Sequence, residues 1–384
     1  MLVLTILFSI LSRLYNEANK LKISPVLGFL GLGLLFGPKG FNYLNDIHTI
    51  EILADLGIVL FLFDMGVHLD FQTLMDMRRD VFGVGLCQFT LTTIAIASIC
   101  GLLGYSFAAS VIIGWSLALS SSAFVLQLLK DKNEMESQYG KSSFGTLLLQ
   151  DLMVVPLLVI IPLLSGKGGS VVDATCKAFL QIGISLSFIG LFGKFLLNPL
   201  FNLVSESGSK ESFIGVILSM VFGMSFLTEG LGLSNTLGAF LSGMLVAETK
   251  HRHKVQIEAT PIRSILVGLF FFTVGFEIDL KMILSKPGII AITVAGILML
   301  KATLAMIACC LFGIHISIAQ RVGLVLSQGG EFAFVAFRTA RSLGILSDDV
   351  TSFLLTCTSL TMALTPILEE IGEKMATKLK IKKS

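Results

Sequence analysis

The chain has 384 residues, of which 54% are hydrophobic and only 14% are charged. Soluble domains carry about 25% charged residues, and a water-soluble globule of this size cannot hide so much apolar surface. These figures exclude a soluble enzyme, a disordered chain and a secreted disulfide scaffold, and they predict an all-α polytopic protein of the lipid bilayer. The net charge of +2 gives no indication of a nucleic acid as partner.

Hydrophobic runs separated by charged residues or by Gly and Pro predict about thirteen transmembrane helices. Their approximate limits are 2–15, 24–38, 51–68, 81–104, 108–129, 142–164, 173–197, 212–229, 233–247, 262–278, 288–312, 318–340 and 349–370. The first run is short and has no basic residue before it, which argues against a signal peptide. We expect that the chain begins inside a span whose outer end was removed.

The basic residues of the connections are unevenly distributed. If the N-terminus lies outside, 20 of the 28 Lys and Arg residues fall on the cytoplasmic side, 7 fall on the opposite side, and Lys301 lies within a span. Cytoplasmic loops carry an excess of Lys and Arg. The bias therefore predicts an N-terminus outside, a C-terminus inside and an odd number of helices.

Three segments of the first half of the chain recur in the second half at nearly one offset. The matched pairs, at offsets of 210, 209 and 207, are 24–28 with 234–238, 60–70 with 269–279, and Leu119-Ser120 with Leu326-Ser327. They relate predicted helices two and nine, three and ten, and five and twelve. A shift of seven helices is odd, so the pattern predicts an inverted-topology repeat, which many secondary transporters have. Chance similarity in apolar sequence is the alternative.

Ionisable side chains inside predicted spans mark candidate functional sites, because each costs roughly 2.5–3.5 kcal/mol to insert. The clearest case is Gln150-Asp151, where the acid lies about ten residues into the span 142–164. A buried carboxylate can hold a proton or a metal ion, but not both at once. That competition is what an exchanger of cations and protons requires. A structural aspartate bonded to nearby backbone is the alternative.

Two other spans carry polar or glycine-rich stretches at equivalent places in the repeat. Ser120, Ser121 and Ser122 lie in the middle of 108–129, and the run from Ser327 to Glu331, with Gln328 and two glycines inside it, lies in 318–340. Such residues in mid-membrane predict unwound stretches whose free carbonyl groups coordinate a cation. Close packing of helices by small residues is the alternative.

Three further charged residues lie within predicted spans. We expect Lys301 to pair with Asp151 in one state or to neutralise the ends of the broken helices, with snorkelling as the alternative. Glu331 is expected to screen the positive end of a half-helix or to pair with Lys301. Asp64, whose repeat mate is Thr273, is a candidate for an accessory protonatable site.

Several catalytic motifs are missing from the sequence. It contains no G-x-x-x-x-G-K-[ST], no G-x-S-x-G and no H-E-x-x-H. Hydrolysis of a nucleotide by this chain is therefore not expected, nor is an intramembrane hydrolase. The sequence predicts a protein that is not an enzyme and that uses no cofactor.

Five short motifs stand out along the chain: ALSSSA at 118–123, LQDL at 149–152, GAFLSG at 238–243, GLFFFTVG at 268–275 and GGEFAFV at 329–335. They resemble motifs of potassium-efflux antiporters in the second monovalent cation:proton antiporter family, which includes the glutathione-gated bacterial systems and the plastid branch. They recur in order over nearly the whole chain, which makes the resemblance specific.

The resemblance implies a sodium/proton-antiporter-like fold with two broken, crossing helices, assembled as a homodimer. It implies scaffold and dimerisation helices in 1–78 and 166–285, core helices in 79–165 and 286–370, and a basic cytoplasmic tail in 371–384. By the same resemblance Asp151 and Gln150 bind the transported ion or proton, with Ser120 to Ser122 beside them, and Lys301 matches the membrane-embedded lysine of the family. An amide at position 150, where many sodium antiporters have a second acid, favours a weakly hydrated ion such as K⁺.

The implied function is K⁺/H⁺ exchange by alternating access, in a bacterial plasma membrane or a plastid membrane, with a role in pH homeostasis. The C-terminus would then be cytoplasmic or stromal. A sodium/proton exchanger on the same fold is the first alternative, and an ion channel or a non-transporting sensor is the second. The nucleotide-binding regulatory domain that many relatives carry is expected to be absent from this chain, which ends at Ser384, either because this member lacks it or because the sequence was cut.

Overall fold

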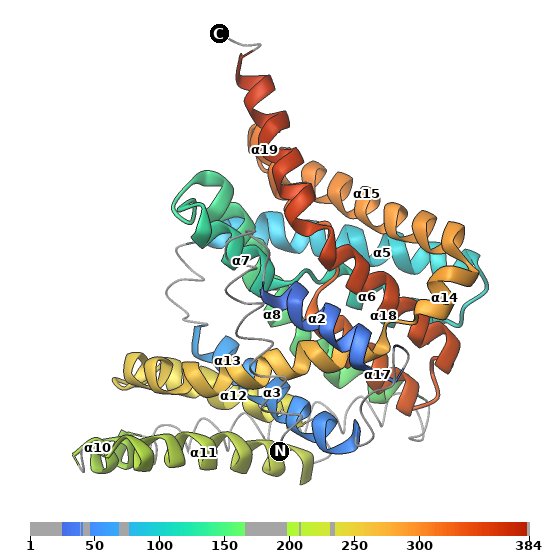
Figure 1. The fold of residues 1–384 in the computed structure, drawn as a ribbon. Helices are drawn as coiled ribbons and strands as arrows, with labels where there is room; N and C mark the ends of the chain where they lie inside the picture. The colour runs from blue at the N-terminus through green and yellow to red at the C-terminus, as the bar shows by residue number, and fades with distance from the viewer. Residues whose placement is uncertain are drawn as a thin grey trace. The chain divides into compact units, whose positions relative to one another are not determined.

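The structure is a computed structural model of the chain, and it describes residues 25–38, 40, 47–68, 77–165, 198–206, 209–230 and 235–381. Within these ranges the chain forms helices joined by turns, and no β-strand occurs (Figure 1). The prediction of an all-α protein is confirmed for this part of the chain. The predicted spans 2–15 and 173–197 lie outside the described residues.

The helices follow the predicted spans closely, except where a span is broken or bent. In chain order they are α2 (Pro25–Phe36), α3 (Ile47–His68), the π-helix η1 (Arg79–Gly85), α5 (Leu86–Leu102), α6 (Phe107–Ala118), α7 (Ser122–Asp131), α8 (Gln138–Leu164), α10 (Asn198–Glu206), α11 (Lys210–Gly230), α12 (Asn235–Ala247), α13 (Arg252–Glu277), α14 (Leu280–Ser285), α15 (Pro287–Leu311), α16 (Ile316–Val325), α17 (Glu331–Ser342), α18 (Asp348–Ala363) and α19 (Thr365–Ile381).

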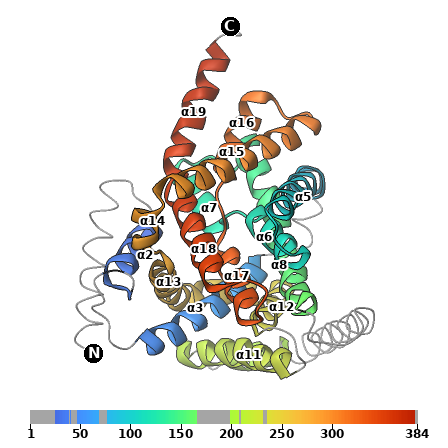
Figure 2. The same cartoon turned by 90° about the vertical axis from the view of Figure 1, so that its right-hand side faces the viewer.

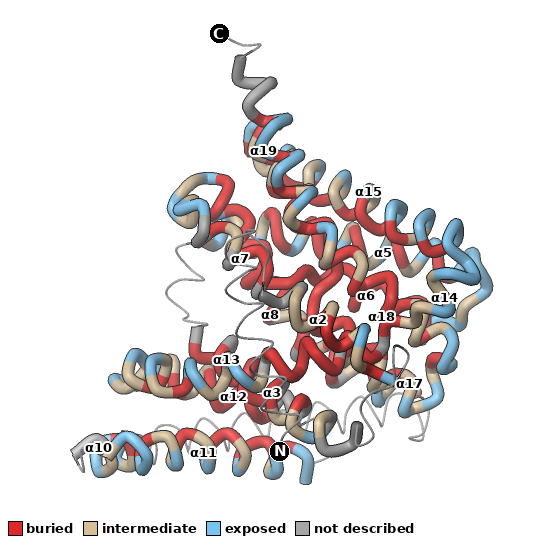
Figure 3. The backbone as a smooth tube through the Cα atoms, in the orientation of Figure 1, coloured by how far each residue is buried: buried red, intermediate tan, exposed pale blue. Residues whose placement is uncertain are grey.

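Several of these helices have the length and composition of membrane spans. Four described segments qualify, Arg79–Leu102, Lys210–Gly230, Arg252–Thr273 and Pro287–Leu311, and a fifth is the α18–α19 pair, which is bent by 45°. α15 alternates buried and exposed residues along its length (Figure 3). The exposed positions of α5 and α15 include large apolar residues: Ile94, Ile99, Leu102, Ile289, Ile292, Met299 and Leu311. Apolar side chains exposed along long apolar helices face lipid, so the chain is an integral membrane protein. The total of thirteen helices stays a prediction.

The start of one helix differs from the sequence prediction. The structure begins α13 at Arg252, whereas the prediction began the helix at 262 because the preceding residues are polar. This extension is amphipathic: Val255 and Ala259 are buried, whereas His253 and Ile257 are exposed. An amphipathic segment can therefore be helical although its mean polarity is that of a loop.

The chain divides into two compact units. The first contains the described residues of Met1–Asn45, Met77–Leu157 and Phe271–Ser384, and the second contains those of Asp46–Asp76 and Leu158–Phe270. In the first unit α5 packs on α6, α15 packs on α16, and α16 packs on α19 (Figure 2). In the second unit α3 packs on α12 and α12 on α11. The assignment of scaffold and core domains for transport stays a prediction.

The repeat seen in the sequence recurs as one helix contact in each unit. In the first unit, a Cβ atom on Gly33 of α2 would lie 1.9 Å from the carbonyl oxygen of Phe272 in α13. In the second unit, a Cβ on Gly243 of α12 would lie 2.0 Å from the carbonyl oxygen of Phe63 in α3. Gly33 matches Gly243 at an offset of 210, and Phe63 matches Phe272 at 209. Both contacts need glycine because the backbones touch, so the two halves share their packing as well as their sequence.

Candidate functional site

The first broken helix consists of α6 and α7. α6 ends at Ala118, Leu119 to Ser121 are unwound and buried, and α7 begins at Ser122. The backbone N–H of Ser120 donates to Oε1 of Gln150 at 2.7 Å. The Ser120 hydroxyl donates to the carbonyl oxygen of Leu326 in the other broken helix at 2.7 Å. Side chains thus replace the helical hydrogen bonds that the break removes.

The second broken helix consists of α16 and α17. The backbone from Leu326 to Gly330 is unwound between them. The N–H of Gly329 donates to the Thr361 hydroxyl at 2.9 Å, and the Thr365 hydroxyl donates to Oε1 of Gln328 at 2.9 Å. A Cβ on Gly330 would lie 2.8 Å from the carbonyl carbon of Ser120, so the two broken segments cross in backbone contact. The predicted pair of broken, crossing helices is confirmed.

Lys301 of α15 lies at this crossing, fully buried. Its ammonium donates to the carbonyl oxygens of Leu119 at 2.9 Å and Gln328 at 2.5 Å, and to the Ser120 hydroxyl at 3.3 Å. Leu119 directly follows α6, where the helix dipole is negative, and Gln328 lies in the unwound stretch between α16 and α17. The structure thus places the Lys301 ammonium against oxygens of both unwound segments, and its role in transport stays a prediction. Among the described contacts its ammonium makes no ion pair with Asp151.

Asp151 of α8 lies beside the first break, and its side chain is 2% exposed. The Ser122 hydroxyl is 3.0 Å from Oδ1 and 3.1 Å from Oδ2 of this carboxylate. Ser122 is the first residue of α7, where the helix dipole is positive and favours a nearby negative charge. The geometry therefore accommodates a charged aspartate inside the protein. The binding of an ion at Asp151 stays a prediction.

The other candidate residues fall into different surroundings. Ser121 places its hydroxyl 3.4 Å from the N–H of Phe124, and its carbonyl accepts from Nε2 of Gln328 at 3.4 Å. Glu331 is the buried first residue of α17 and lies within electrostatic range of Asp151. Asp64 lies in the second unit, on α3, where it forms an ion pair with Arg263 of α13. Its accessory role stays a prediction.

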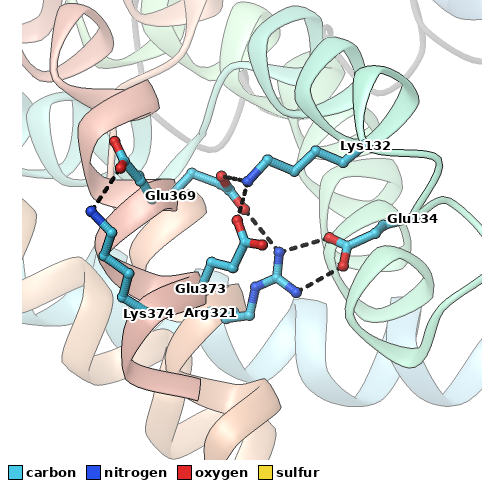
Figure 4. Close-up of polar contacts among 7 residues, drawn as sticks. Lys132, Glu134, Arg321, Glu369, Glu373 and Lys374 are labelled. Carbon is cyan, nitrogen blue, oxygen red and sulfur yellow. Dashed lines mark hydrogen bonds and ion pairs between the residues drawn. The ribbon is translucent and has the colours of Figure 1, made fainter. Parts of the chain in front are cut away.

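The sequence did not predict a network of ion pairs that the structure shows between the turn after α7 and the helices α16 and α19. This network joins Lys132, Glu134, Arg321, Glu369 and Glu373, and a separate ion pair, Lys374 with Glu370, lies on the same helix α19 (Figure 4). Arg321 of α16 donates to both oxygens of Glu134, at 3.0 and 2.7 Å, and to Glu369 of α19 at 2.8 Å. Its guanidinium also stacks on the Tyr139 ring at 4.0 Å. The network joins the turn after α7 to α16 and α19, so it fixes one half of each broken helix.

A crossing of two broken helices beside a buried carboxylate defines a secondary transporter of the inverted-repeat type. The model of the transmembrane sodium/hydrogen exchanger family matches residues 3–370 of the chain. The chain therefore belongs to the sodium/hydrogen exchanger family. The description of this family is that of a transmembrane exchanger.

Curated proteins that are similar to this chain over most of its length are named K(+) efflux antiporters. The chain is 40% identical over 370 residues to the chloroplastic K(+) efflux antiporter 1 of Arabidopsis thaliana, covering 93% of this chain and 31% of that protein. It is 37% identical over 381 residues to the chloroplastic K(+) efflux antiporter 3 of the same plant, covering 93% of this chain and 49% of that protein. The chain thus spans less than half the length of these relatives.

A solved structure shares the fold at low sequence identity. The sodium proton antiporter MjNhaP1 from Methanocaldococcus jannaschii, at pH 8, superposes with a TM-score of 0.69 and 16% identity, covering 98% of this chain and 97% of that chain. This similarity concerns the fold alone, and it confirms the sodium/proton-antiporter-like fold that the sequence resemblance implied.

Proposed function

We propose that the chain exchanges K⁺ for H⁺ across a membrane by alternating access, with Asp151 holding either ion in turn. The observation that carries the proposal is the placement of this acid. It is buried, it faces the first break, and both its oxygens are within hydrogen-bond distance of the Ser122 hydroxyl. A carboxylate with a hydroxyl and free carbonyl groups nearby offers the oxygen ligands that alkali cations accept.

The exchange follows from the charge of this one site. When the site faces one side, Asp151 releases its proton, and the N-terminus of α7 stabilises the resulting charge. A partly dehydrated K⁺ then binds the carboxylate and the Ser122 hydroxyl. Occupation by K⁺ or H⁺ neutralises the carboxylate, so the occupied site can move across the membrane. An empty, charged site is costly in a low-dielectric surrounding, and uncoupled movement is suppressed.

The preference for K⁺ has two supports. Relatives at 40% and 37% identity are named K(+) efflux antiporters, and Gln150 supplies a neutral amide beside Asp151 where a second acid would add charge. Sodium/proton exchange is the second candidate, because the matching family model is described as a sodium/hydrogen exchanger.

The proposal also covers the membrane, the orientation and the assembly of the protein. The chloroplastic names of the relatives favour a plastid membrane, and the distribution of Lys and Arg favours an N-terminus outside with a cytoplasmic or stromal C-terminus. We further propose that the protein is a homodimer in which residues 79–165 and 286–370 form the moving core.

Flux in reconstituted vesicles tests the proposal. Purified protein is sealed into vesicles with a pH-sensitive dye inside, and proton movement is recorded after K⁺ or Na⁺ is added outside. K⁺ is expected to drive proton flux more strongly than Na⁺, and Asp151→Asn is expected to abolish both. The exposed Asp348, replaced by Asn, is the matched control and should retain full flux.

Three results would contradict the proposal. Undiminished exchange by a folded Asp151→Asn protein would exclude the site. Stronger coupling to Na⁺ than to K⁺ would identify the sodium exchanger. Electrical current without proton counterflow would identify a channel.

A further inference from the structure

A second buried glutamine lies behind Gln150. Gln88 of α5 is 0% exposed. Its Oε1 accepts from Nε2 of Gln150 at 2.8 Å, and its Nε2 donates to the Thr92 hydroxyl at 3.2 Å. A buried amide is costly unless its polar atoms are hydrogen-bonded. Gln88 meets this condition through its contacts with Gln150 and Thr92.

Local backbone geometry brings Gln88 to this place. The π-helix η1 precedes α5, and its wider turn rotates the helix that follows, as π-helical turns at functional sites do. η1 also lies tightly against α8. A Cβ on Gly145 would lie 2.7 Å from Cβ of Asp80, and the Ser142 hydroxyl donates to the Asp80 carboxylate at 2.7 Å. Gln88 therefore enters the space beside Gln150 at a fixed register.

The polarity of this hydrogen-bond chain has one consistent solution. The N–H of Ser120 can only donate, so Oε1 of Gln150 must face it. Nε2 of Gln150 then faces Gln88, which must present its own oxygen. If the amide of Gln150 turned over, two donors would meet at Ser120 and two acceptors at Gln88. The Ser120 N–H thus fixes which end of the Gln150 amide faces the broken segment, and Gln88 holds the other end of that amide.

We propose that Gln88 is a positioning residue of the cation site. By holding Gln150, it keeps the Ser120 N–H bonded and directed away from a bound cation, and it keeps Ser122 in register with Asp151. Gln150 then acts chiefly by shaping the first break, and Asp151 and Ser122 act as ligands. This inference rests on the proposed function of K⁺/H⁺ exchange.

The test is a double-mutant cycle in the vesicle assay, with the half-saturating K⁺ concentration as the readout. Gln88→Met removes both amide atoms at nearly constant volume. A neutral hydrogen bond corresponds to about three- to tenfold in an equilibrium constant, so we expect the half-saturating concentration to rise by that factor. The maximal rate is expected to stay within about twofold. Because Gln88 acts through Gln150, Gln88→Met should add nothing in a Gln150→Leu background.

Two further variants guard against a purely structural explanation. Thr93→Val removes a buried hydroxyl from the same helix that has no hydrogen-bond partner among the described residues, and it should leave the half-saturating concentration unchanged. Thr92→Val is milder than Gln88→Met and should shift this concentration in the same direction by a smaller factor. It serves as the test if Gln88→Met does not fold.

The outcomes separate the two proposals. A wild-type protein that exchanges K⁺, with Gln88→Met and Thr92→Val indistinguishable from it, would overturn this inference alone. Full additivity of Gln88→Met and Gln150→Leu would also overturn it. A wild-type protein that exchanges no cation at all would overturn the proposed function together with this inference.

Discussion

In both broken helices a side chain from a neighbouring helix accepts a hydrogen bond from a backbone N–H of the unwound segment, but the accepting residue differs. In the first, the freed N–H of Ser120 is bonded by the side chain of Gln150. In the second, the freed N–H of Gly329 is bonded by the side chain of Thr361. The two donors are 209 residues apart and the two acceptors are 211 apart, so these hydrogen bonds are equivalent in the repeat.

The difference lies in the next residue. Asp151 follows Gln150 and faces the first break, whereas Met362 follows Thr361. The repeat therefore duplicates the frame that keeps a helix broken inside the membrane, and only one copy carries an acid beside it. In the second half Lys301 contributes a cation that serves both breaks at once. The following predictions separate the hydrogen bonds that hold the broken helices, here called the frame, from the binding of the transported ion. They begin with the largest expected effect.

Replacing Lys301 by Met should cause the largest loss of stability. The substitution leaves the carbonyl groups of Leu119 and Gln328 without their buried donor. Each unsatisfied buried group costs about 1–3 kcal/mol, and we expect a net loss of roughly 2–4 kcal/mol once the relief of burying a charge is included. Thermal unfolding in detergent measures it. The exposed Lys281, changed to Met, is the control, and an equal melting temperature for both variants would exclude the role of Lys301 at the crossing.

Replacing Gly330 by Ala should separate the two broken segments. Its Cβ would lie 2.8 Å from backbone atoms of Ser120, and overpacking of this kind costs about 1–3 kcal/mol. Exchange should fall because the first break is displaced from Asp151. The control is Gly296→Ala on α15, where a Cβ meets nothing within 4 Å. Normal exchange and stability in Gly330→Ala would contradict the close crossing.

Replacing Thr361 by Val should weaken the second broken helix without changing the binding of K⁺. The N–H of Gly329 loses its acceptor, so stability should fall by about 1 kcal/mol. The half-saturating K⁺ concentration should stay at the wild-type value, in contrast to Gln150→Leu. A rise in this concentration as large as that of Gln150→Leu would show that the two breaks contribute equally to ion binding.

The smallest effect concerns Lys132 in the charged network. Burial lowers the pKa of Lys132, but hydrogen bonds to Glu369 and Glu373 outweigh it and raise the pKa above 10.5. A raised lysine pKa gives stability that is present below the unfolded value and is lost as pH rises through the folded value. Lys132→Ala should therefore lower stability by under about 1 kcal/mol.

The difference between Lys132→Ala and wild type should stay constant from about pH 6 to about pH 9. It should shrink only above 10.5. Melting temperatures across this range measure the difference. The matched control is Lys141→Ala, because Lys141 is exposed and pairs with the exposed Glu136. A difference that changes near neutral pH would contradict the assignment.

Much of the frame could be predicted from the sequence. Serines and paired glycines in the middle of apolar spans indicated both breaks, because hydroxyl groups and absent side chains are what an unwound membrane segment needs. Gly33 and Gly243 indicated a repeat, and the structure shows the same backbone contact around each. These features depend on residue type and spacing alone, which a sequence displays directly.

The partners of the polar side chains could not be predicted in the same way. Gln88 lies among ordinary span residues, and its contact with Gln150 depends on how α5 and α8 face each other. Arg321 and Glu369 are 48 residues apart and lie in different predicted spans, 318–340 and 349–370. The contacts of Lys301 with both unwound segments also depend on the helix register. Sequence spacing does not fix how two helices turn toward each other, so such pairings require the structure.

The most direct test of the central claim is K⁺ binding to the purified protein as a function of pH. If one carboxyl group holds either a proton or K⁺, the apparent dissociation constant should rise about tenfold for each unit of pH decrease once that group is mostly protonated. Asp151→Asn should remove both the binding and its pH dependence. A dissociation constant that is independent of pH, or K⁺ binding that survives in Asp151→Asn, would contradict the account.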